Sequence, residues 1–140
     1  NKGRVNGLSA GLAVIAVNNF LVGRVAEVEK NFSKVILIFD SNSSVNVITQ
    51  DTRVGGVAKG SYGLGVAMEM IPIDAKINIG ETVLTSGLND GVPGGLVIGK
   101  IKGVIKKANE IFQRASIAPA VEIKNLEKVF VLLNGSEFSE

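Results

Sequence analysis

The chain has 140 residues, which is the size of one typical domain, and 46% of them are hydrophobic, so a substantial apolar core is expected. It contains no His and no Cys, and this excludes zinc fingers, thiol enzymes, disulfide frameworks and Ser-His-Asp triads. Fifteen basic and thirteen acidic residues give a net charge of only +2. Apart from the pair Lys106-Lys107 the lysines are scattered, so no nucleic-acid-binding stripe is indicated.

Short runs of β-forming residues alternate with turn signals along the whole chain, and no segment has sustained helical periodicity. The pattern predicts an all-β protein. The expected strands, in chain order, are Leu12–Val17, Leu21–Val28, Lys34–Phe39, Val45–Ile48, Val54–Ala58, Val66–Met70, Val83–Thr85, Val97–Ile105, Ile111–Ala118 and Val129–Leu133. The third of these strands is apolar on both alternating faces, so it is expected to be buried on both sides.

One segment is long enough to be mistaken for a membrane span. Nineteen uncharged residues run from Val5 to Gly23, a length that could just cross a bilayer. The pair Asn18-Asn19 divides this segment as a turn would, so two strands are the preferred interpretation. The chain begins at Asn1 without a signal pattern and is expected to be an excised part whose targeting segment lies upstream.

Two segments of the chain resemble each other. Val22–Val28 matches Ile98–Val104, with Gly23 and Gly99 at equivalent positions. In both copies the apolar residues after the Gly are three apart, which a β-bulge would place on one face. The repeat predicts two related barrel-like subdomains, an inner barrel of 20–75 and a second barrel of 1–19 with 76–133, followed by a polar tail of 134–140 that is expected to fray.

Catalytic chemistry has few candidates in this sequence. Gly94–Ile101 resembles a phosphate loop, but Ile101 replaces the magnesium-binding Ser or Thr, so no cofactor is expected. Ser86 with an unspecified lysine could form an atypical hydrolase site, and a small barrel that binds single-stranded nucleic acid is a third alternative. Metal sites are not expected either.

Protein–protein contact is the remaining possibility, and exposed aromatic and arginine side chains are its usual anchors. Phe20 follows the Asn-Asn turn and Phe32 follows a charged pair, so both could lie at the surface. The candidate partner-binding residues are Phe20, Leu21, Phe32, Arg53 and Phe112.

Several motifs in order resemble a known family. They are Leu21–Val25 with Val28, Ser33–Ile38, Asp40–Ser43, Gly56–Gly60, and Ile79–Leu88 followed by Pro93–Ile101. This series is similar to the rod shape-determining MreC proteins, and its strongest piece is Thr85-Ser86-Gly87, a spacer, and the segment from Pro93 to Gly99. Val92 departs from the pattern, because many relatives carry an aromatic residue there.

The resemblance implies two six-stranded barrel-like subdomains, one of them likened to a trypsin-like protease fold without its catalytic groups. It places them outside the bacterial cytoplasmic membrane, with a single-pass anchor upstream. It also implies a scaffold of the elongasome that binds the class B penicillin-binding protein of cell elongation. MreD, RodA and, indirectly, MreB are the other partners it implies, together with self-association.

Overall fold

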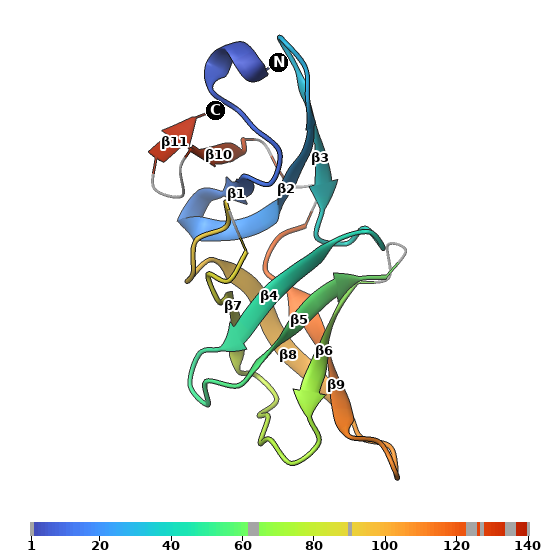
Figure 1. Cartoon of the computed structure of the whole chain (residues 1–140). Coiled ribbons are helices and arrows are strands. Elements are labelled where there is room, and N and C mark those ends of the chain that lie inside the picture. Colours follow the sequence, from blue (N-terminus) through green and yellow to red (C-terminus); the bar gives the residue numbers. More distant parts are fainter. Residues whose placement is uncertain are drawn as a thin grey trace.

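The computed structural model describes residues 2–61, 65–89, 91–122, 126, 128–133 and 137–139. Within them two short 3-10 helices, η1 (Arg4–Asn6) and η2 (Val17–Asn19), accompany eleven strands. The molecule is elongated, with a six-stranded barrel at one end and an open five-stranded sheet at the other, where both termini lie (Figure 1). No helix of the described part of the chain is long and apolar enough to span a bilayer.

The barrel is formed by strands β4 to β9. Antiparallel pairing runs in the order β8-β7-β4-β5-β6-β9, and β8 also pairs with β9, which closes the ring. Alternate residues point inward, as in β4, where every second side chain is buried. The strands are β4 (Ser44–Thr49), β5 (Gly55–Gly60), β6 (Val66–Pro72), β7 (Thr82–Thr85), β8 (Val97–Ile105) and β9 (Phe112–Pro119).

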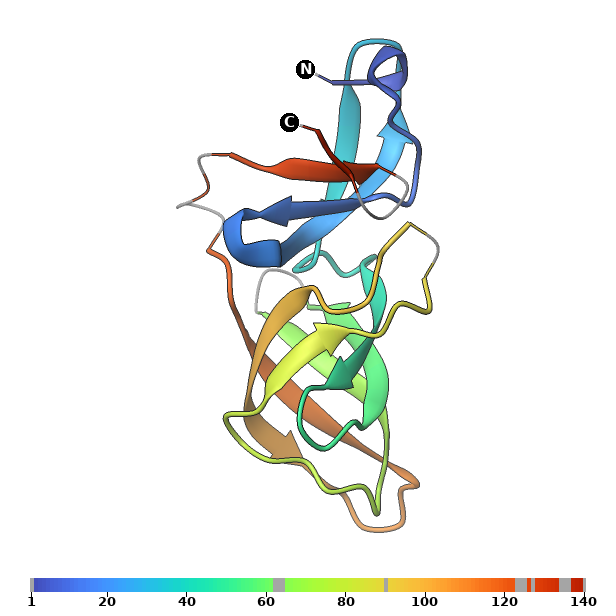
Figure 2. The ribbon, with the colours of Figure 1, turned by 90° about the vertical axis from the view of Figure 1, so that its left-hand side faces the viewer.

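The other strands form the five-stranded sheet, in the order β11-β10-β1-β2-β3. The β2–β3 hairpin extends away from the barrel (Figure 2). A single parallel bridge between Phe20 of β2 and Val97 of β8 links the sheet to the barrel. The strands are β1 (Ala13–Ala16), β2 (Phe20–Val28), β3 (Ser33–Leu37), β10 (Phe130–Leu133) and β11 (Glu137–Ser139).

One hydrophobic core runs through both parts. The sheet contributes Ile15 and Leu21 to this core, and the barrel contributes Met68, Ile98 and Ile117. All five side chains are almost fully buried. The loop between β7 and β8 joins the two parts, since the Ala13 N–H donates to the Gly91 carbonyl over 3.0 Å. A side chain at position 91 would lie 2.7 Å from the Gly11 carbonyl oxygen, so this contact requires glycine.

The all-β class is confirmed, and each of the ten predicted strands is present with ends shifted by a few residues. Asn18 and Asn19 both have left-handed backbones, with φ of 67° and 62°, so the predicted turn divides the uncharged segment. The two predicted bulges are also present. The pairing register shifts between Val25 and Glu27 in β2, and between Ile101 and Gly103 in β8.

The prediction that the third strand is buried on both sides is wrong. Among the described strands, β3 pairs with β2 alone and therefore lies at the edge of the sheet, where Val35 is exposed and Ile36 is half-buried. Alternation and hydrophobicity alone do not reveal whether a strand has one neighbour or two.

The strand pairings also group the chain differently from the predicted subdomains of 20–75 and 1–19 with 76–133. The barrel takes strands from Ser44 to Pro119, because β9 closes the ring against both β6 and β8. In the tail, residues 137–139 pair with β10 instead of fraying. The other tail residues and Asp90 lie outside the described residues.

Candidate partner-binding site

The five predicted partner-binding residues lie in three separate places. Phe20 is half-buried at the junction of sheet and barrel, and Phe32 is exposed at the tip of the β2–β3 hairpin. Arg53 and Phe112 lie at the end of the barrel away from the sheet, in the β4–β5 turn and at the start of β9. Leu21 has no exposed surface, so its side chain belongs to the core and cannot contact a partner.

The β4–β5 turn that presents Arg53 is held by a buried carboxylate. The N–H groups of Asp51 and Thr52 donate to Glu81 Oε2 over 2.8 and 2.6 Å, and the Thr52 hydroxyl donates to the same carboxylate. Burial alone would raise the pKa of Glu81, but the hydrogen bonds from Thr52 and Asp51 and a backbone bond at Asn78 lower it below its usual value. Glu81 therefore stays ionised and fixes the turn.

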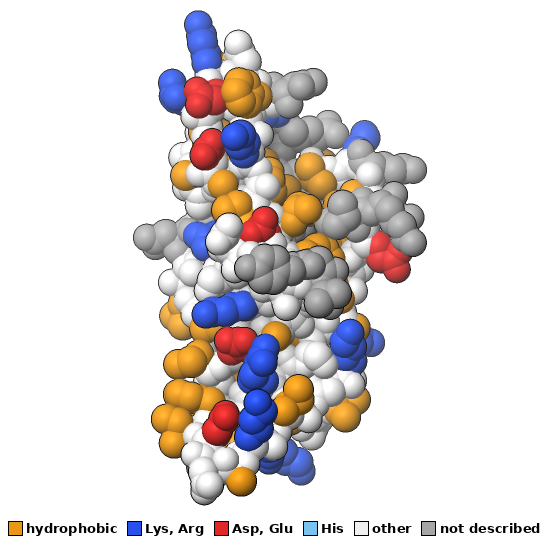
Figure 3. Space-filling view, turned by 90° about the vertical axis from the view of Figure 1, so that its right-hand side faces the viewer, with side chains coloured by type: hydrophobic (Ala, Val, Ile, Leu, Met, Phe, Trp, Pro, Cys, Tyr) orange, Lys and Arg blue, Asp and Glu red, His pale blue; other side chains and the backbone are white. Residues whose placement is uncertain are grey.

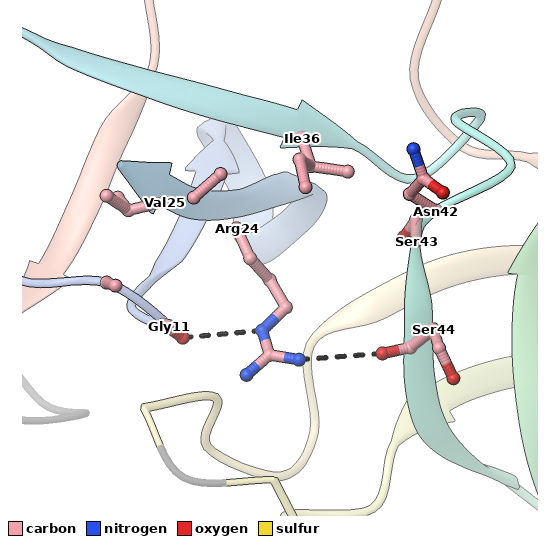
Figure 4. A pocket seen from close by; sticks show the side chains of 9 residues that line it. Gly11, Arg24, Val25, Ile36, Asn42, Ser43 and Ser44 are labelled. Carbon is pink, nitrogen blue, oxygen red and sulfur yellow. Dashed lines mark hydrogen bonds between the residues drawn. The ribbon is translucent and has the colours of Figure 1, made fainter. Parts of the chain in front are cut away.

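A pocket of about 370 Å³ lies at the junction, on the side of the β7–β8 loop. Figure 4 shows the Arg24 side chain reaching from β2 across this pocket toward the start of β4. Its Nε lies 3.4 Å from the Gly11 carbonyl oxygen, and one terminal nitrogen lies 3.5 Å from that of Ser44. The contact with Ser44 joins the sheet to the barrel, and the sequence interpretation did not single out Arg24.

The β7–β8 loop carries the Thr85-Ser86-Gly87 motif and is held from both sides. The Thr85 hydroxyl donates to the Pro93 carbonyl over 2.6 Å and accepts from the Leu96 N–H over 2.9 Å. Asn89 Oδ1 accepts from the Asn46 N–H, which ties the loop to β4. The loop exposes 78% of Leu88, a side chain that the sequence analysis also missed.

Hydrolysis at Ser86 receives no support from this geometry. Its hydroxyl oxygen is buried and has no hydrogen-bond partner among the described residues, so no lysine activates it there. Within the same part of the chain, no three acidic residues gather into a set that could hold a metal ion.

Exposed apolar side chains gather instead at the far end of the barrel. Sequence reasoning named Phe112 there but missed the other exposed apolar residues of this end, because their exposure depends on where the barrel strands end. These residues are Met70, Ile79, Ile105 and Ile111, each more than half exposed. Single exposed apolar residues are common, whereas several on one end of a domain indicate a contact surface.

The family model for the barrel core of the rod shape-determining protein MreC matches residues 1–133. The chain belongs to the MreC family. It is 28% identical to the cell shape-determining protein MreC of Escherichia coli over 94% of this chain and 36% of that protein. It is also 28% identical to MreC of Listeria monocytogenes, of which it covers 48%. The chain thus spans a third to a half of these MreC proteins.

Solved MreC structures have the same fold. MreC of Listeria monocytogenes superposes with a TM-score of 0.85 at 28% identity, covering 99% of this chain and 68% of that one. A complex between the penicillin-binding protein PBP2 and MreC from Helicobacter pylori gives 0.74 at 23% identity, covering 86% and 75%. The major periplasmic domain of another MreC gives 0.75 at 21% identity, again covering 86% and 75%. Like these proteins, the chain is built on the MreC fold.

Proposed function

We propose that this chain is the extracytoplasmic part of a non-enzymatic scaffold that maintains rod cell shape. It binds the class B penicillin-binding protein that crosslinks peptidoglycan during elongation, and it activates this transpeptidase. The scaffold works at the outer face of the cytoplasmic membrane, where a single-pass anchor in another part of the protein holds it.

The observation that carries this proposal is the solved complex of a family member with PBP2. Family membership over residues 1–133 supports extending that role to this chain. The chemistry of the described surface is consistent with it, because the hydroxyl oxygen of Ser86 is buried while apolar side chains lie exposed at the end of the barrel and at the tip of the β7–β8 loop.

The physical mechanism is selection among conformations of the partner. A scaffold that binds one conformation of a flexible synthase more tightly than the others raises its population without taking part in the chemistry. A closed barrel suits this task, because its strands pair around the ring and leave no open edge there.

Further partners follow from the family resemblance rather than from a contact. We propose MreD and RodA as direct or neighbouring components, the MreB filament as an indirect one, and association between copies of the scaffold. These assignments concern the whole protein, of which this chain would be one part.

The proposal is tested by biolayer interferometry between this chain and the extracytoplasmic part of the class B penicillin-binding protein of the same bacterium. We expect saturable binding with a Kd below about 100 micromolar, or about −5.5 kcal/mol. Circular dichroism would establish that the chain is folded in the same buffer. A folded chain that shows no binding up to that concentration would overturn the proposal.

A further inference from the structure

The outer face of strands β6, β9 and β8, together with the β8–β9 turn, carries a band of exposed side chains near the far end of the barrel. We define this barrel band as Met70, Ile105, Ile111, Phe112 and Arg114. On β9, residues 112 and 114 point outward, while Gln113 between them and Ala115 after them are buried. Arg114 pairs directly with Ile105 of β8, so these two side chains are neighbours on the same face.

Met70 enters the band through an irregularity in β6. Met68 pairs with Ala115 and Ile71 pairs with Gln113, so two residues of β6, Glu69 and Met70, lie opposite Arg114 alone. Arg114 forms an ion pair with Glu69, in which a guanidinium nitrogen lies 3.0 Å from a carboxylate oxygen. This pair holds the centre of the band in place.

The backbone at Met70 is strained. Its φ is 61°, in the left-handed region that glycine adopts readily and that bulky residues rarely occupy. The side chain is nevertheless 53% exposed, so the strain is not offset by packing of methionine in the core. Strain of this kind is typical of functional positions, and here it holds a flexible apolar side chain toward solvent.

Basic residues outnumber acidic ones around the band. Strands β5, β6, β8 and β9 and the β8–β9 turn carry six exposed or half-exposed basic residues, against Glu69 and Glu110 as acidic ones. The β6–β7 loop, which meets Ile111 through a hydrogen bond from Ile73, adds the exposed pair Asp74 and Lys76. In the space-filling view of this side, blue side chains form a column across the lower half, beside orange atoms that gather along one edge (Figure 3). The basic residues are Lys59, Lys100, Lys102, Lys106, Lys107 and Arg114.

We infer that the barrel band is the docking surface for an apolar segment of the transpeptidase that is flanked by acidic residues. This inference rests on the proposed function. Exposed Ile111, Ile105 and Met70 would supply the apolar contact, and the surrounding lysines would attract the acidic flanks. A second copy of this chain fits the surface poorly, because two such faces would repel each other.

The test measures binding of the same transpeptidase fragment to three variants. Met70→Gly removes the side chain and suits the left-handed backbone, Ile111→Ser removes a 73% exposed side chain, and Lys102→Glu reverses a charge. We expect the first two to weaken affinity about tenfold or more. The third slows association about threefold or more at low salt, and the difference shrinks as salt is added.

Matched controls are taken from the sheet end. Val17→Ser removes a 64% exposed side chain, and Lys30→Glu reverses an exposed charge. Both should bind as the unaltered chain does. The midpoint of urea unfolding, measured for all five variants, separates lost binding from lost folding.

The outcomes distinguish this inference from the proposed function. If the unaltered folded chain does not bind the transpeptidase, the proposed function fails. If it binds, and Met70→Gly, Ile111→Ser and Lys102→Glu bind equally well, the docking surface is wrong while the function stands. Co-sedimentation with vesicles of phosphatidylglycerol forms a second arm. Vesicle binding that the band variants abolish, with transpeptidase binding intact, would assign the band to a membrane and overturn the inference.

Discussion

The barrel and the five-stranded sheet are both built from antiparallel hairpins, but the barrel is closed and the sheet has an open edge. In the barrel every strand has two neighbours, since β8 and β9 complete the ring. In the sheet, β3 has one neighbour and exposes Val35 at an open edge. The two β-bulges occupy equivalent positions in β2 and β8, so closure rather than local geometry distinguishes the parts. A strand held on both sides cannot shift to accommodate a change, whereas an edge strand can.

The strongest test compares Gly99→Ala in the barrel with Gly23→Ala in the sheet. A methyl group at position 99 would lie 2.1 Å from the Ala118 carbonyl oxygen, and one at position 23 would lie 2.2 Å from that of Ile36. We expect Gly99→Ala to lower the free energy of unfolding by roughly 3–4 kcal/mol. Ala118 belongs to β9, and β9 is paired on both sides, so it cannot move away from the added methyl group. Gly23→Ala should cost roughly half as much, since the edge strand β3 can move. Urea unfolding measures both.

Gly55→Ala is the control for this pair, because the nearest atom to a methyl group there is 3.9 Å away. Its free energy of unfolding should change by less than about 0.5 kcal/mol. Equal losses at positions 99 and 23 would show that closure of the ring does not set the response.

A smaller effect is expected from Val45→Ala in the barrel and Val35→Ala in the sheet. Val45 is almost fully buried at the start of β4, and its truncation should cost about 2–2.5 kcal/mol through lost burial and the cavity left behind. Val35 is partly exposed at the edge, so the same change there should cost under about 0.5 kcal/mol. Thermal and urea unfolding of the two variants compare them; similar losses would mean that β3 is covered in solution.

The smallest difference in stability between barrel and sheet is expected for substitutions of one glutamate in each part. Glu81→Gln removes the buried carboxylate that holds the β4–β5 turn and should cost about 1–2 kcal/mol at neutral pH. Glu27 forms only an exposed ion pair with Lys34 in the sheet, so Glu27→Gln should leave stability unchanged.

The pH dependence of the Glu81 contribution has a defined sign. The pKa of Glu81 is lowered by folding, so its stabilisation is complete above the unfolded-state value of about 4.5 and is lost as pH falls through the lower folded-state pKa. The unaltered chain and Glu81→Gln should therefore converge in stability in acid, as measured by urea unfolding at several pH values. A difference that stays constant down to pH 2 would contradict this assignment.

Much of the fold could be predicted because strand-forming runs and turn residues are local signals. Asn18-Asn19 marks a turn by its tolerance of left-handed backbones, and the spacing after Gly23 and Gly99 indicated the bulges before any pairing was known. The residues of the candidate site were harder to predict from the sequence. Leu21 follows Phe20 in sequence but lies in the core, and the strained, exposed Met70 was read as an ordinary strand end.

The amino-acid sequence by itself determined the all-β class, the positions of the strands and the absence of histidine and cysteine chemistry, because these depend on residue type and spacing. The tertiary structure alone decided which strands pair, that β9 closes the barrel against both β6 and β8, and that β3 remains at an edge. It also decided which apolar side chains reach solvent. Pairing and burial depend on contacts between residues far apart in the chain, and a local pattern of apolar residues does not specify the partner that will cover them.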